Sequence, residues 1–399
     1  MVTASQSQGI KVVLKENGIT HSFTLLTTLA LSACLYIQIA NADVTESPVR
    51  AWIDRNASYG YSGAVLVSRG GDILVSKGFG LADKESGKPY TADTVVDTLS
   101  ITKQFTAAAI LKLQEQGALS VDDPVTRFFE DVPDDKKSIT LHHLLTHTSG
   151  LKDSFEGDYS KVTRRDLERS IWKSKLLSVP GEEYNYSNVG YGLLGIVIEK
   201  VSGNSYEAFL NENLFQPAGM RWTGYHLPEW EPENFAVGYR SHAVGAHRWL
   251  ARMRSWFGAG DRWGTPLDQY WAEDGPWWSL RANGGILSTL NDLHRWHLAL
   301  EDDVVLSASS KNQLYFPHVR ESPDGNAYYA YGWVVSKGKG KVTQIYHDGG
   351  NPYFFSFFYR SLEHNFLVLF STNTWGTVRS GELKKLVDAA IDEYSWLEE

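Results

Sequence analysis

Residues 100–108 read Ser-Ile-Thr-Lys-Gln-Phe-Thr-Ala-Ala, a stretch that joins a candidate nucleophile to the start of an apolar helix. Ser100 and Lys103 are three residues apart, so on a helix their side chains share a face. A serine hydroxyl is a weak nucleophile until a neighbour accepts its proton, and a lysine with a pKa lowered by burial can accept it. A helix-capping serine beside a solvated lysine would give the same S-x-x-K pattern, so this motif is weak evidence by itself.

Two further motifs contain side chains of the kinds used in catalysis. Tyr186 and Asn188 form a Y-x-N, in which a phenol held beside an ammonium can accept a proton and an amide can hold a substrate carbonyl or the lysine. Farther along, His347 contributes a group that titrates near neutrality. Gly349 and Gly350 let a strand approach a ligand closely and aim an N–H at it. An ordinary polar turn and a strand-end turn are the alternatives.

The three motifs occur in the order found in the serine β-lactamase and penicillin-recognising enzyme superfamily, which the chain resembles. The likeness is greatest to class C β-lactamases, D-alanyl-D-alanine carboxypeptidases, D-aminopeptidases and related esterases. The resemblance covers roughly residues 49–394 and includes the short segments 62–67, 143–151 and 283–289. The resemblance implies an α+β fold: an antiparallel sheet built from both chain ends and flanked by helices, plus a mostly helical domain. The site would lie in the groove between them.

The resemblance also implies roles for the first two motifs. Ser100 would be the acylated nucleophile, Lys103 and Tyr186 the proton-transfer pair, and Asn188 a substrate-positioning residue. Which of Lys103 and Tyr186 is the base stays open, because a coupled pair titrates as a unit.

In the third motif, His347 stands where many relatives carry a lysine, and Gly349 follows within the same motif. The backbone N–H groups of Ser100 and Gly350 would form the oxyanion hole. An imidazole with its ordinary pKa of about 6.5 is mostly neutral at physiological pH. We therefore expect weak attraction for anionic substrates, and a peptidase or esterase rather than an efficient β-lactamase.

The N-terminal region contains an apolar leader. Residues 23–40 are uncharged, follow Lys11 and Lys15, and precede Ala-Asn-Ala at 40–42, which predicts a signal peptide cleaved before Asp43. A lipobox ending at Cys34 and an uncleaved membrane anchor are the alternatives. All three place the protein outside the cytoplasm, in the periplasm or cell envelope. Cys34 is also the only cysteine, which excludes an intrachain disulfide.

The rest of the chain, residues 43–399, reads as one hydrolase domain. Its sheet part is expected at about 43–99 and 320–399, and its helical part at about 100–319. Strands are predicted at 64–68, 72–76, 354–359 and 366–371, and helices at 101–116, 204–215, 291–300 and 383–394. The net charge of −9 without a basic stripe argues against nucleic-acid binding.

Residues 222–296 hold nine of the 14 tryptophans and have no clear periodicity. This Trp-rich segment is either an aromatic-packed insertion or a wall that faces the substrate. In the second case, replacing Trp256, Trp263, Trp277 or Trp278 should change KM or the ranking of substrates.

The histidine pairs give no metal site. His143 and His147 have helical i, i+4 spacing, but the zinc-hydrolase motif needs a glutamate beside the first histidine, where Leu144 stands. His294 and His297 lie on a predicted helix and are interpreted as packing or surface residues. We expect neither a metal nor another cofactor.

The sequence therefore predicts an exported serine hydrolase that forms an acyl-enzyme on Ser100. Its substrate would be a peptide, including peptides of D-amino acids, an ester or a β-lactam. The alternatives are a non-catalytic binding or scaffold protein that keeps the fold, and a cell-wall-binding protein that is acylated but turns over very slowly. The expected partner is a small-molecule or peptide substrate, and the N-terminal segment offers a route to membrane attachment.

Overall fold

The computed structural model describes residues 47–240, 261–269, 271–374 and 380–394. The predicted leader, including Cys34 and the cleavage site at 40–42, lies outside these residues, and so does Trp256 within the Trp-rich segment. Within the described ranges, every helix is too short or too polar to cross a lipid bilayer.

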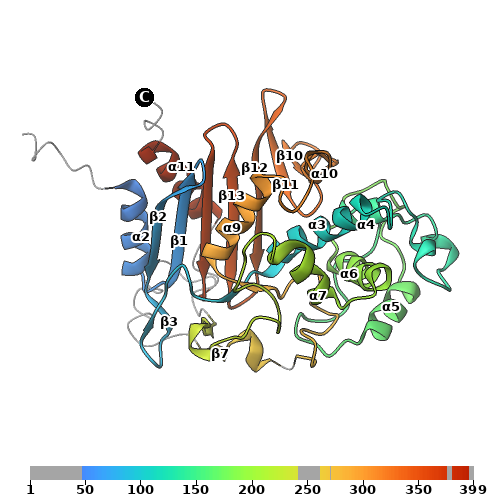
Figure 1. Ribbon diagram of the computed structural model, residues 1–399, viewed down its shortest axis with the longest axis horizontal. Coiled ribbons are helices and arrows are strands. Elements are labelled where there is room, and N and C mark those ends of the chain that lie inside the picture. Colours follow the sequence, from blue (N-terminus) through green and yellow to red (C-terminus); the bar gives the residue numbers. More distant parts are fainter. Residues whose placement is uncertain (1–46, 241–260, 270, 375–379, 395–399) are drawn as a thin grey trace, which may run out of the picture. The chain divides into compact units, whose positions relative to one another are not determined.

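The main sheet is antiparallel and takes strands from both ends of the chain (Figure 1). Its eight strands lie in the order β2-β1-β14-β13-β12-β11-β10-β9. The bounds are β1 Gly63–Arg69, β2 Asp72–Phe79, β9 Val319–Arg320, β10 Ala327–Tyr329, β11 Val334–Gly338, β12 Lys341–Gly350, β13 Phe355–Ser361 and β14 Phe366–Thr372. The last strand, β14, pairs with the first, β1, from Gly63–Thr372 to Arg69–Phe366. The predicted fold class is confirmed.

Helices cover both faces of this sheet, which explains why β1 is apolar at consecutive positions. Val65 and Val67 pack with the terminal helices α2 (Pro48–Ser58) and α11 (Ser380–Tyr394). Ala64 and Leu66 point to the opposite face and belong to the larger core. Successive side chains of a strand alternate between faces, so a strand covered on both sides is apolar throughout.

The larger core surrounds α3 (Thr102–Glu115), in which 11 of the 14 residues are buried. The other α-helices in the described ranges are α4 Leu141–Leu145, α5 Arg164–Lys173, α6 Asn188–Ser202, α7 Tyr206–Leu210, α9 Leu290–Glu301 and α10 Ala308–Leu314. The predicted helix at 204–215 is divided into α7 and a π-helical turn, Asn211–Phe215. There the Gln216 N–H bonds to the Asn211 carbonyl, five residues back, which widens the turn.

Short strands complete the fold and fix the segment before the candidate nucleophile. They are β3 Leu81–Asp83 with β4 Lys88–Pro89, β5 Val96–Asp97 with β8 Leu287–Ser288, and β6 Gly238–Tyr239 with β7 Arg262–Gly264. The 3-10 turn η1 (Leu99–Ile101) follows β5 and lies against β12. A Cβ at Gly349 would come within 2.6 Å of Ser100 N and 2.7 Å of Thr98 O, so only glycine allows this approach.

Candidate active site

Ser100 lies in η1, immediately before α3, in a turn with an uncommon backbone conformation. Leu99 has a φ of +54°, which a leucine rarely adopts. The Asp97 carboxylate accepts a hydrogen bond from the Leu99 N–H at 2.7 Å, as in an Asx turn. The Ser100 hydroxyl then meets two of the predicted partners: its Oγ lies 3.0 Å from Lys103 Nζ and 2.9 Å from Tyr186 OH.

Lys103 is completely buried and has three neighbours around its amine. Besides Ser100 Oγ, the Nζ bonds to Asn188 Oδ1 and to the Asn283 carbonyl, both at 2.7 Å. The Asn188 amide is oriented by Asp153, whose carboxylate accepts from Nδ2 at 2.9 Å. A neutral amine has two hydrogens, and the two acceptors use both. Its lone pair then points to Ser100 Oγ, as a proton acceptor requires.

The pKa of Lys103 fits this arrangement. Burial lowers it to about 7, although the negative charges of Asp153 and Asp158 act in the opposite direction. A large fraction of Lys103 is therefore neutral at physiological pH.

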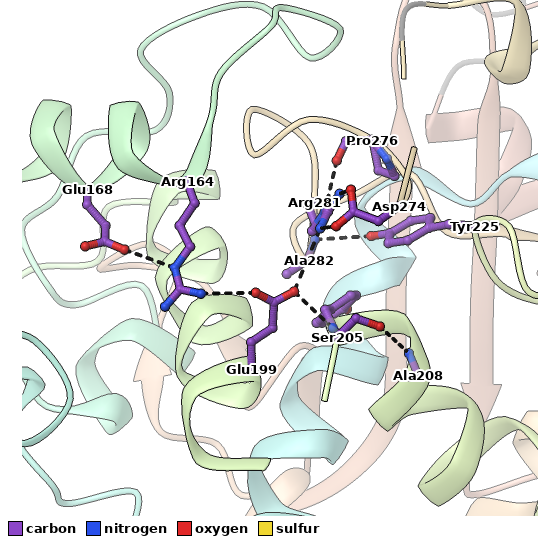
Figure 2. Close-up of polar contacts among 11 residues, drawn as sticks. Arg164, Glu168, Glu199, Ser205, Ala208, Tyr225, Asp274, Pro276, Arg281 and Ala282 are labelled. Atoms are coloured by element: carbon purple, nitrogen blue, oxygen red, sulfur yellow. Dashed lines mark hydrogen bonds and ion pairs between the residues drawn. The ribbon is translucent and has the colours of Figure 1, made fainter. Parts of the chain in front are cut away.

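The Asn283 carbonyl belongs to a turn that an ionic network around the buried Arg281 holds in place (Figure 2). Arg281 is 3% exposed, and its guanidinium pairs with both oxygens of Asp274, at 2.6 and 2.7 Å. It also lies 3.8 Å from Glu199 on α6. The next residue, Ala282, has a φ of +69°, and its N–H donates to Tyr225 OH at 3.2 Å. This network ties the turn that contacts Lys103 to the helical part of the fold.

Tyr186 has the opposite pKa shift. Burial raises the pKa of its phenol well above the usual value, even though the hydrogen bond to Ser100 acts against this. His147 lies beside the phenol ring, with the ring centroids 4.3 Å apart. The Tyr186 hydroxyl therefore stays protonated and donates to Ser100 Oγ. Of the two groups whose roles the sequence left open, Lys103 has the pKa suited to a base in the free protein.

His347 lies on β12 in the same site, but its predicted titration near neutrality is wrong. The side chain is 4% exposed, and burial together with the charge of Lys103 lowers its pKa to about 3. Its Nδ1 lies 2.6 Å from the Asp348 carbonyl, so this nitrogen carries the proton. Its Nε2 then accepts from Tyr329 OH at 3.1 Å. His347 is a neutral, fixed imidazole at any physiological pH.

The backbone N–H of Gly350 takes no part in the pairing of β12 with β13. The Asn351 N–H donates to the Phe354 carbonyl, so the neighbouring Gly350–Phe355 pair of β12 and β13 is a non-hydrogen-bonded one. The Gly350 N–H thus points away from β13. On that side β11 pairs with β12 only as far as Tyr346.

The space beyond Tyr346 is a cavity of about 310 Å³ that both Ser100 and Gly350 line. Ser100 itself lies in the first helical turn, where backbone N–H groups have no acceptor within the helix. Two N–H donors are therefore available to an oxyanion in this cavity.

The cavity is acidic, which the motifs revealed only in part, since Asp348 stands between His347 and Gly349 whereas Glu321 lies outside every motif. Asp348 and Glu321 line it together with Tyr184 and Tyr329. Burial raises the pKa of both carboxyl groups, and for Glu321 the charge of Asp348 adds to the effect. Tyr184 stands two residues before Tyr186, so the Y-x-N motif could have indicated it. Glu321 and Tyr329 come from β10 and the segment before it, outside any motif.

Several other residues singled out by the sequence have structural contacts. His143 Nδ1 accepts from the Thr140 N–H in a capping box, and His147 Nδ1 accepts from the Ser187 N–H at 3.0 Å. His294 and His297 are buried on α9, as expected for packing residues. Among the described residues, no group of three or more His, Cys, Asp and Glu side chains could hold a metal ion.

In the described part of the Trp-rich segment, tryptophan side chains pack against other residues of the chain. Trp296 lies in the core against Phe105, with ring centroids 5.0 Å apart, and Trp278 stacks with Arg281. Trp263 stacks on Tyr353 at 4.5 Å. None of the tryptophans in the described ranges lines the cavity at Ser100.

Comparison with known proteins assigns the chain to a family. A family model described as Beta-lactamase matches residues 49–393. The chain belongs to the beta-lactamase family. The family groups serine hydrolases and relatives with the same fold, among them penicillin-binding proteins and esterases. The recognition made from the three motifs is confirmed.

The relatives of the chain in the beta-lactamase family include a penicillin-binding protein and an esterase. Penicillin-binding protein 4* of Bacillus subtilis (strain 168) is 30% identical over 324 residues, covering 78% of this chain and 68% of that protein. Esterase EstB of Burkholderia gladioli is 37% identical over 198 residues, covering 44% of this chain and 50% of the esterase. The matches thus span about half to two thirds of these relatives.

Solved structures have the same fold. The penicillin binding protein from Bacillus halodurans superposes with a TM-score of 0.70 at 26% identity, covering 86% of this chain and 98% of that one. D-amino acid amidase from Ochrobactrum anthropi SV3 superposes with a TM-score of 0.71 at 22% identity, covering 88% and 99%. At that identity the amidase supports the fold alone.

Proposed function

We propose that the protein is an exported serine hydrolase that cleaves uncharged or cationic amides, peptides or esters through an acyl-enzyme on Ser100. The observation that carries the proposal is that Lys103 and Tyr186 both lie within hydrogen-bonding distance of one hydroxyl group, that of Ser100. Lys103 Nζ lies 3.0 Å from Ser100 Oγ with a pKa of about 7, and Tyr186 OH lies 2.9 Å from it with a raised pKa.

Acylation follows from these contacts. Ser100 Oγ forms a bond to the substrate carbonyl carbon while its proton passes to the neutral Lys103 amine. The carbonyl oxygen becomes an oxyanion and receives hydrogen bonds from the Ser100 and Gly350 N–H groups. The bond to the leaving group then breaks, and that group takes a proton relayed from Lys103 through the Tyr186 hydroxyl.

Deacylation uses the same groups in reverse. A water molecule attacks the ester carbonyl on Ser100, and Lys103, now neutral again, takes the water's proton by way of Tyr186. The Ser100–carbonyl bond breaks, the acid leaves, and the proton returns to Ser100 Oγ. No cofactor enters this cycle, and its protons are carried by the substrate, the water molecule and the side chains of Ser100, Lys103 and Tyr186.

The cavity's charge supports the choice of substrate. Asp348 and Glu321 line it, and His347, which stands where many relatives have lysine, is neutral because of its burial. An anionic substrate would meet repulsion and no compensating cation near His347. We therefore place β-lactams and peptides with a nearby free carboxylate below neutral amides and esters. Export is proposed from the apolar leader and from the penicillin-binding relatives.

Covalent labelling tests the proposal directly. Incubation with a fluorophosphonate should add one adduct, which peptide mass spectrometry should locate at Ser100. Ser100→Ala should abolish labelling and lower turnover by about 10⁶-fold, the usual loss of a nucleophile. An adduct at another residue, or residual turnover above a few per cent in Ser100→Ala, would remove Ser100 from its role. Labelling without turnover of any amide or ester would instead favour the slowly turning-over binding protein.

A further inference from the structure

Behind the proposed oxyanion hole, three side chains link the two backbone segments that supply its N–H groups. The Tyr159 hydroxyl donates to Asp97 Oδ2 at 3.1 Å. The same hydroxyl accepts from Asn351 Nδ2, also at 3.1 Å. Asp97 precedes Ser100 by three residues, and Asn351 directly follows Gly350. Tyr159 belongs to neither segment and lies in the connection between α4 and α5.

The Asp97 end of this link controls the backbone before Ser100. Asp97 is fully buried, and its second oxygen holds the Leu99 N–H at 2.7 Å. Leu99 keeps its left-handed conformation, which is unfavourable for a leucine, only while its surroundings enforce it. The direction of the Ser100 N–H depends on that conformation because Ser100 is the next residue.

The Asn351 end controls the backbone after Gly350. Asn351 is 6% exposed, and its Oδ1 accepts from the N–H groups of Tyr353 and Phe354 at 2.9 and 2.8 Å. These bonds close the turn between β12 and β13. They also fix the amide orientation, because the oxygen is occupied and only the NH₂ can face Tyr159.

The hydrogen bonds along the link have a consistent direction. Asn351 donates to Tyr159, because its Oδ1 already accepts from two backbone N–H groups. Tyr159 donates to Asp97 Oδ2, a carboxyl group whose pKa burial raises to about 7. Trp263 packs against the Tyr159 ring, with centroids 4.9 Å apart, and stacks on Tyr353 at the other end. The tyrosine is thus held by its hydroxyl and by its ring.

We propose that Asp97, Tyr159 and Asn351 form a brace that sets the separation and direction of the Ser100 and Gly350 N–H groups. The three are positioning residues, and their role rests on the proposed function. Oxyanion stabilisation requires donors that are already aimed when charge develops, so a loosened brace should weaken transition-state binding more than substrate binding.

Tyr159→Phe removes the central hydroxyl and keeps the ring. The variant should lower kcat about 10- to 100-fold, less than the ~10²–10³ lost when an oxyanion donor is removed altogether, with KM changed less than threefold. Affinity for phenylboronic acid, which forms a tetrahedral adduct on the serine, should fall by a similar factor. Asn351→Asp keeps the oxygen that accepts from Tyr353 and Phe354 but replaces the NH₂ group, and should act in the same direction.

Tyr90→Phe is the matched control. Tyr90 is a buried tyrosine directly after β4 whose hydroxyl bonds to Ser371 Oγ on β14 at 2.9 Å, and neither residue lines the cavity. It should lower Tm while leaving kcat and boronic acid affinity as in the wild type. If Tyr159→Phe and Asn351→Asp behave like Tyr90→Phe, the link is structural and the brace is refuted.

The result also separates the brace from the proposed function. Fluorophosphonate labelling at Ser100 in the wild type, with an unchanged kcat in both brace variants, would overturn the brace alone. Labelling that persists in Ser100→Ala would overturn the function, whatever the brace variants do. Should Tyr159→Phe fail to fold, Asn351→Asp carries the same comparison.

Discussion

The fall of kcat/KM at acidic pH, here called the acid limb, should follow the protonation of Lys103. A base works only in its deprotonated form, which for lysine is the neutral amine, and burial lowers the pKa of Lys103 to about 7. At pH 5 about one lysine in 100 would be neutral, against about nine in ten at pH 8. For a substrate that does not ionise, log kcat/KM should rise with a slope of one below pH 7 and level off above it. The total change between pH 5 and 8 is about 100-fold.

Asp158→Asn should move this limb in a predictable direction. The Asp158 charge raises the pKa of Lys103 by favouring the ammonium, so removing that charge lowers the pKa and shifts the limb to more acidic pH. His347→Asn is the control, because a histidine with a pKa of about 3 contributes nothing between pH 5 and 8. The limb should stay where it is in that variant.

The assay is hydrolysis of p-nitrophenyl butyrate, read at the isosbestic wavelength of nitrophenol, with the melting temperature measured at each pH. A profile that is flat from pH 5 to 9, or a limb near the ordinary lysine pKa, would show that Lys103 is not the base. If the acid limb disappears in His347→Asn, the group that titrates is the His347 imidazole and not Lys103. A shift to more alkaline pH in Asp158→Asn would contradict the electrostatic reasoning.

Three further predictions concern the proton donor, the cavity and the tryptophans. Tyr186→Phe should lower kcat/KM by about 10²–10⁴, with little change in the acid limb, because the phenol relays a proton without being the base. Asp348→Asn and Glu321→Gln should each raise kcat/KM for an anionic ester relative to a neutral one by up to about fivefold. If the anionic-to-neutral ratio of kcat/KM is the same in the wild type and the variants, these carboxylates do not select the substrate. Trp278→Ala should cost roughly 3 kcal/mol in unfolding free energy without reordering substrates, whereas a changed ranking would restore the substrate-facing interpretation.

Sequence motifs predicted the groups around Ser100 because those groups are fixed by local spacing and by order along the chain. Ser100 lies in the 3-10 turn that leads into α3, where Lys103 follows, and Tyr186 and Asn188 lie on either side of the N-cap of α6. A sheet covered by helices on both faces could also be predicted from local sequence, because apolar runs at both ends of the chain indicate strands buried on both faces.

Properties that arise from tertiary burial were not predictable. The pKa of His347 depends on what covers it, and no residue near it in sequence indicates that Tyr329 and Lys103 do. The acidic lining depends on Glu321, which reaches the cavity only through the folding of the segment before β10. The π-helical turn at 211–215 was missed because periodicity alone does not distinguish a widened turn from an α-helix.

The pairing of β1 with β14 also affects how the chain can fold as it is synthesised. Once residues 63–79 have left the ribosome, the β1–β2 hairpin is complete, but the edge of β1 stays open for roughly 300 more residues, until β14 appears. An apolar strand with a free edge is a template for pairing with other chains. Contacts of such long sequence separation also form slowly. We therefore expect refolding yields to fall steeply with protein concentration, and chaperones that bind extended apolar segments to raise them.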